Sequence, residues 1–120
     1  MCFGTDALYA GPLCHPRSYQ AAIHLLYTYW KQEAVLPLQS LINRMSAKPA
    51  QRLGLANRGK IAEGYKADLV LLNPEQLKDC SDVMAPDAPS KGIAMVMVNG
   101  TVAMQDGVFT GKTAGSLLLW

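Results

Sequence analysis

Residues 95–104 read MVMVNGTVAM, two β-prone runs joined by Asn99-Gly100. An Asn-Gly pair between such runs is the strongest short-range signal for a β-hairpin, because both turn residues must adopt a positive φ angle. Asp106-Gly107 supplies a second turn ahead of another β-prone run at 108–110. The sequence therefore predicts a hairpin followed by one further short strand.

Upstream of the hairpin, the continuous apolar run LVLL at 69–72 lies between Asp68 and Asn73-Pro74. A run of this length and character is typical of a strand buried on both faces. The Pro- and Asp-containing stretch 75–91 reads as an excursion loop. Residues 55–120 therefore predict a thin sheet of three or four strands, antiparallel or mixed.

Further upstream, the pattern changes to helical spacing. Apolar side chains recur at i, i+3, i+4 and i+7 over residues 18–33, with Ser18 as the predicted N-cap. A second helix follows Pro37, which suits a first turn, and a third is expected to open at Pro49 and close at Gly54. The first 17 residues read as a loop, with one short strand expected at Cys2-Phe3.

The predicted fold class is α+β, with an N-terminal loop and two to three helices followed by a small β-sheet. The boundary falls near residue 54, which divides the chain into 1–54 and 55–120. The helices can cover one face of the sheet, and an apolar sheet needs a cover on the other face as well. That second face has no evident cover within these 120 residues.

Composition narrows the classes of function. The chain has 120 residues and a net charge of +2, and its eleven Lys and Arg are scattered. Nucleic-acid binding normally needs a basic face, so we expect no nucleic-acid partner. No stretch approaches the roughly 20 apolar residues of a membrane helix, and the first residues lack the pattern of a signal peptide. Three cysteines without a CxxC pair favour a reducing cytoplasm over a disulfide framework.

Several segments resemble one known family, in its order along the chain. They are Gly4-Thr5-Asp6 with His15-Pro16-Arg17, then MSAKPAQRLGL at 45–55, GKIAEGYKADLV at 59–70 and the final hairpin with Asp106-Gly107. Together they resemble the end of a metal-dependent amidohydrolase of the N-acyl-D-amino-acid deacylase (D-aminoacylase) branch. Dihydroorotases and hydantoinases share the later segments, and a cyclic amidase of that kind stays an alternative.

The resemblance implies a particular role for each part of the chain. Residues 1–54 would be the C-terminal end of a TIM-barrel-like hydrolase, and residues 55–120 the C-terminal half of its β-sandwich. Asp6 would be the catalytic aspartate and a metal ligand, because a carboxylate there can take the proton of a metal-activated water. Arg17 would bind the α-carboxylate of an N-acyl amino acid, since a guanidinium fork matches a carboxylate.

The resemblance also implies zinc in the parent enzyme. A zinc site needs three or four ligands, whereas this sequence offers only His15 and His24, without a His-x-His pair. We therefore expect no metal on this chain alone, and we expect Asp6 to bind zinc only with ligands from a missing N-terminal part. The chain by itself is expected to be inactive.

Plainer interpretations remain for the same residues. Asp6 can cap a turn and Arg17 can be an ordinary surface residue, His15 reads as a hydrogen-bonding loop residue, and His24 as a packing residue on the first helix. The whole chain can instead be a non-catalytic assembly module that forms homo-oligomers through its uncovered sheet. A small complete enzyme built on Cys14 and His15 is disfavoured, because adjacent residues rarely form a nucleophile–base pair.

Overall fold

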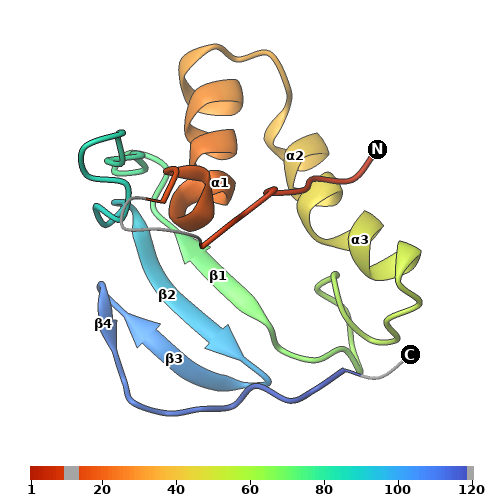
Figure 1. The fold of residues 1–120 in the computed structure, drawn as a ribbon. Coiled ribbons are helices and arrows are strands. Elements are labelled where there is room, and N and C mark those ends of the chain that lie inside the picture. Colours follow the sequence, from red (N-terminus) through yellow and green to blue (C-terminus); the bar gives the residue numbers. More distant parts are fainter. Residues whose placement is uncertain (10–13, 119–120) are drawn as a thin grey trace.

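The computed structural model describes residues 1–9 and 14–118. Helices come first and strands second, which confirms the α+β class (Figure 1). The elements are α1 (Arg17–Leu26), the π-helical segment η1 (Tyr27–Gln32), α2 (Leu38–Met45), α3 (Ala47–Arg52), β1 (Leu69–Leu72), β2 (Ile93–Val98), β3 (Thr101–Gln105) and β4 (Val108–Phe109).

The four strands form one antiparallel sheet in the order β1-β2-β3-β4. The β2–β3 turn confirms the predicted hairpin, since Asn99 and Gly100 have φ angles of 47° and 81°. The Asp106-Gly107 turn has the same signature, with φ angles of 49° and 80°, and it leads into β4. The turn chemistry of the sequence therefore determined this part of the fold.

Strand β1 was predicted correctly in position and wrongly in burial. Val70 and Leu71 point to opposite faces of the sheet, and they are 57% and 56% exposed. β1 is an edge strand, and only the side chains at its two ends are partly covered. The apolar run is therefore not buried on both faces by the described residues.

The helical segment α1 and η1 runs from 17 to 32, close to the predicted 18–33. Ser18 is not the N-cap, because Pro16 already has helical angles and the helix begins at Arg17. The buried Ser18 hydroxyl instead donates to the Leu8 carbonyl at 3.0 Å and accepts from the Leu8 N–H at 3.3 Å. The Ser18 hydroxyl thus bonds to the Leu8 backbone and does not cap the helix.

Two further boundaries differ from expectation. Helix α3 begins at Ala47, so Pro49 lies in its first turn instead of opening it, whereas Gly54 follows the helix with a φ of 66° as predicted. No strand forms at Cys2-Phe3; the Phe3 N–H donates to the Arg44 carbonyl of α2 at 3.0 Å. Phe3 therefore contacts α2, and residues 1–9 pair with no strand among the described residues.

The core unites the two halves of the chain. Ile23 and Leu26 of α1 and Leu41 of α2 are buried together with Leu77, which lies in the connection between β1 and β2. The helices lie on one side of the sheet (Figure 1). The connection, residues 73–92, is irregular as predicted, apart from one bridge between Lys78 and Lys91. Within the described part of the chain, no helix is long and apolar enough to cross a membrane.

Candidate functional site

Asp6 and Arg17, the two predicted site residues, lie side by side. The Arg17 Nη2 is 3.3 Å from the Asp6 Oδ2. Asp6 has a φ of 49°, a left-handed conformation that aspartate tolerates better than most residues. Its side chain is 86% exposed and that of Arg17 is 46% exposed, so the pair is open to a ligand. An exposed pair of this kind contributes about 0–1 kcal/mol to stability, and a competing carboxylate can displace it.

The segment His15-Pro16-Arg17 starts α1. The Arg17 N–H donates to the His15 Nδ1 at 3.1 Å, and the Ser18 N–H donates to the His15 carbonyl at 2.9 Å. His15 is therefore the hydrogen-bonding loop residue that the sequence indicated. Its Nδ1 is an acceptor here, which leaves it unavailable as a base for Cys14.

A pocket of about 400 Å³ opens beside Arg17. Its apolar wall includes Phe3 and Leu25, and its polar lining includes His15, His24 and Asp79. The pocket thus runs from the start of α1 along the helix to the 79–83 part of the β1–β2 connection.

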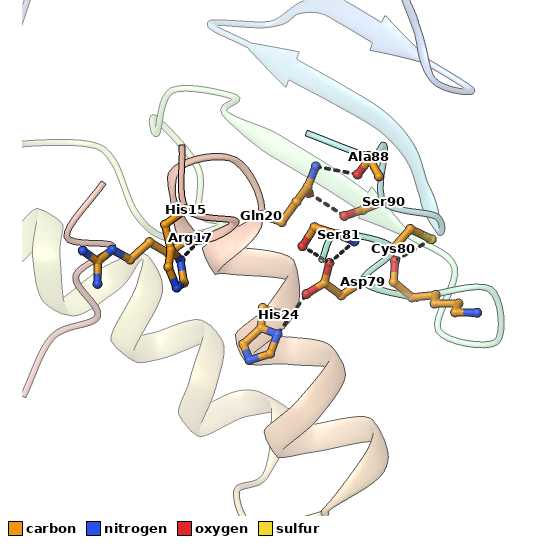
Figure 2. Close-up of polar contacts among 10 residues, drawn as sticks. His15, Arg17, Gln20, His24, Asp79, Cys80, Ser81, Ala88 and Ser90 are labelled. Atoms are coloured by element: carbon orange, nitrogen blue, oxygen red, sulfur yellow. Dashed lines mark hydrogen bonds and ion pairs between the residues drawn. The ribbon is translucent and has the colours of Figure 1, made fainter. Parts of the chain in front are cut away.

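His24 differs from its prediction as a packing residue. Its side chain is 59% exposed, and its Nδ1 lies 2.9 Å from the Asp79 Oδ2 (Figure 2). The side chain of Asp79 is only 8% exposed. Burial acts to raise the pKa of Asp79, but hydrogen bonds from Ser81 and the His24 imidazole outweigh it and lower the pKa below its ordinary value.

The contact of Asp79 with His24 was not predicted from the sequence. Asp79 lies 55 residues from His24, in a connection whose only sequence signal was its Pro and Asp content. The three cysteines are free; Cys2 is exposed, and Cys14 and Cys80 are partly buried.

Comparison with known proteins decides the family. The sequence profile described as the amidohydrolase family matches residues 1–104. The chain belongs to the amidohydrolase family. A D-aminoacylase of Alcaligenes xylosoxydans xylosoxydans is 35% identical over 115 residues, which are 96% of this chain and 24% of that protein.

Solved structures of amidohydrolases share this fold. A crystal structure of D-aminoacylase matches with a TM-score of 0.88 and 32% identity, over 92% of this chain and 23% of that one. An N-acyl-D-glutamate deacylase from Bordetella bronchiseptica, complexed with zinc and a phosphonate inhibitor, matches with a TM-score of 0.83 and 31% identity, over 89% of this chain and 23% of that one. The resemblance to the D-aminoacylase branch is thereby confirmed.

This amidohydrolase chain spans about a quarter of the length of these relatives. Among residues 1–9 and 14–118, no three His, Cys, Asp or Glu side chains gather closely enough to hold a metal ion. Zinc takes three or four ligands in protein sites. Asp6 offers one carboxylate, so the described residues do not by themselves fit a zinc site.

Proposed function

We propose that this chain is the C-terminal part of a zinc-dependent hydrolase that cleaves the amide bond of N-acyl-D-amino acids. The observation that carries the proposal is the contact of Asp6 with Arg17 at the start of α1, 3.3 Å apart. Both groups are exposed, and together they offer a proton acceptor beside a carboxylate receptor. The family relationship supplies the reaction class.

Arg17 would bind the substrate's α-carboxylate. Its present partner is the carboxylate of Asp6, which is the same chemical group that the substrate would bring. Binding of substrate would therefore exchange one carboxylate for another on the guanidinium and release Asp6. The freed Asp6 would accept the proton of the attacking water and pass it to the leaving amine.

The metal requires residues beyond those described. When bound, zinc would activate the attacking water, with Asp6 as one ligand. The remaining ligands would come from the rest of the hydrolase. We propose a domain boundary at residue 54. Residues 1–54 would form the end of the catalytic barrel, and residues 55–120 would form half of a β-sandwich. We propose a cytoplasmic location, because three cysteines without a CxxC pair suit a reducing compartment.

The role of Asp6 can be tested in a chimera in which this chain replaces the matching quarter of a D-aminoacylase. Asp6→Asn keeps the size of the side chain and removes the proton acceptor. We expect kcat for N-acetyl-D-leucine to fall by about 10²- to 10⁴-fold, as for loss of a general base. Asp87→Asn alters another exposed carboxylate and should leave kcat unchanged. Equal rates for Asp6→Asn and Asp87→Asn would show that Asp6 is only a turn residue.

A second candidate function rests on the sheet. Val70, Leu71, Val108 and Phe109 are exposed at its two edge strands, and such a surface favours self-association. In this alternative the chain is a metal-free assembly module. Light scattering combined with metal analysis of the purified chain distinguishes the two functions. A stable metal-free oligomer of the chain, together with an inactive chimera, would favour assembly.

A further inference from the structure

Three polar side chains of the helical segment α1 and η1 hold the β1–β2 connection. Gln20 donates to the Ala88 carbonyl at 3.1 Å, His24 meets Asp79 at 2.9 Å, and Lys31 donates to the carbonyls of Glu75 and Leu77 at 2.7 and 2.9 Å. Gln20 and His24 lie four residues apart on one face of α1, and Lys31 of the π-helical segment η1 reaches the same connection. The His24 contact is the member of this set that involves a carboxylate, and that carboxylate is largely covered.

The surroundings of Asp79 determine which hydrogen bond His24 makes. The Asp79 Oδ1 accepts from the Ser81 N–H at 2.9 Å and from the Ser81 hydroxyl at 2.7 Å. Its Oδ2 faces the His24 Nδ1 (Figure 2). An ionised carboxylate can only accept hydrogen bonds, so the proton of the bond must lie on Nδ1. The lowered pKa of Asp79 agrees with an ionised carboxylate.

We propose that His24 is a positioning residue: held as the Nδ1–H tautomer by Asp79, it locks the 79–83 segment onto α1 and so fixes the helix that begins with Arg17. This inference goes beyond the proposed function, because the lock depends only on contacts within this chain. Apolar packing accounts for little of the role of His24, since its ring is largely exposed.

Loss of His24 would leave the largely covered Asp79 carboxylate with one oxygen unpaired. A poorly hydrated charge that loses its partner is destabilising, so the segment would move until water reaches that oxygen. Three other charged or titratable groups line the same pocket, His15 and Arg17 from the helix side and Asp82 from the loop. Asp82 accepts from the N–H groups of Met84 and Ala85 at 2.7 and 2.8 Å, so its Oδ1 is engaged within the loop.

The tautomer gives a direct test by ¹⁵N NMR of the full chain, at a pH where the imidazole is neutral. We expect the His24 proton on Nδ1. In Asp79→Asn, the amide oxygen must face Ser81 and the amide N–H must face His24. Nδ1 then becomes the acceptor, and the proton should move to Nε2. A wild-type proton on Nε2, or the same tautomer in both proteins, would overturn the proposal.

The positioning role is tested by hydrogen exchange and by the Arg17 side-chain N–H signals. His24→Ala should speed amide exchange over 79–83 by about tenfold or more, the effect of losing a charge-assisted hydrogen bond, and should shift the Arg17 signals. His24→Asn places an amide N–H near the position of Nδ1 and should restore both readouts. Gln32→Ala, an exposed change on the same helical segment, serves as the control. Unchanged exchange and unchanged Arg17 signals in a folded His24→Ala would contradict the role; if that variant does not fold, the Asp79→Asn tautomer decides.

Discussion

At the scale of single residues, two contacts between distant parts of the chain involve the first helix: Arg17 meets Asp6, and His24 meets Asp79. Asp6 and Arg17 were assigned from a resemblance, and the structure brings them to 3.3 Å from each other. Ser18 and His24 were both assigned the wrong local role. Their true partners, Leu8 and Asp79, lie 10 and 55 residues away, and helical spacing carries no information about them.

Asp79 makes stability depend on pH in a direction that its lowered pKa fixes. A carboxyl group whose pKa is lower in the folded state stabilises the fold at pH values above its unfolded pKa. That contribution is lost as the pH falls through the folded value. This stabilisation is therefore lost at pH values below 3.8, the ordinary pKa of an aspartate side chain.

Urea unfolding at a series of acid pH values checks this prediction. The wild type should lose more stability on acidification than Asp79→Asn, which has no carboxyl group to protonate at this position. Asp87→Asn, an exposed change in the same connection, should follow the wild type. Parallel curves for wild type and Asp79→Asn would contradict the prediction.

Arg17 gives a second test at this scale. In the chimera, Arg17→Lys keeps the charge and loses the planar fork that matches a carboxylate. We expect KM to rise about tenfold or more with kcat little changed, the signature of binding shared by ground state and transition state. Arg52→Lys at the exposed end of α3 should change neither constant.

At the scale of elements, the sequence predicted best where one or two residues dictate a turn. Asn99-Gly100 and Asp106-Gly107 both have positive φ angles, and the strands follow from them. Boundaries set by tertiary contact were less accurate. Pro49 was expected to open α3, but proline is tolerated throughout a first turn, and the helix begins at Ala47.

No turn signal in the sequence marks Gly92, although its backbone is left-handed. It has a φ of 87°, and a Cβ there would lie 2.6 Å from the backbone of the fully buried Leu77. Gly92→Ala should lower the free energy of unfolding by about 2–4 kcal/mol, the sum of a left-handed alanine and an overpacked contact. Thermal or urea unfolding measures the change.

Gly111→Ala is the matched control for Gly92→Ala. Gly111 has a φ of 75°, but a Cβ there would meet no atom within 4 Å. Only the conformational cost of about 1 kcal/mol should remain. Equal losses for the two variants would show that the approach of Gly92 to Leu77 does not constrain the fold.

At the scale of the whole molecule, one core joins the helices to the sheet. Leu77 of the β1–β2 connection is buried among residues of α1 and α2, while Val70 and Phe109 on the sheet stay exposed. The sequence predicted that helices come first and a small sheet second, since this order follows from apolar patterning. It could not predict that the connection would fill the core, because a loop with mixed polarity has no periodicity to read.

The exposed sheet gives a prediction for the purified chain. Phe109→Lys on β4 replaces an exposed aromatic side chain with a charge that discourages pairing of strand edges. We expect this variant to be less prone to self-association than the wild type in light scattering at equal concentration, with an unchanged circular dichroism spectrum. Equal self-association in both proteins would mean that β4 is not part of the associating surface.

Hydrolysis of N-acetyl-D-leucine and N-acetyl-L-leucine by the zinc-loaded chimera shows most directly whether this chain is part of an N-acyl-D-amino-acid hydrolase. We expect release of D-leucine, slow or no release of L-leucine, and loss of activity on removal of zinc. A folded chimera that binds zinc and cleaves neither substrate, or only the L form, would contradict the assignment of this chain to an N-acyl-D-amino-acid hydrolase.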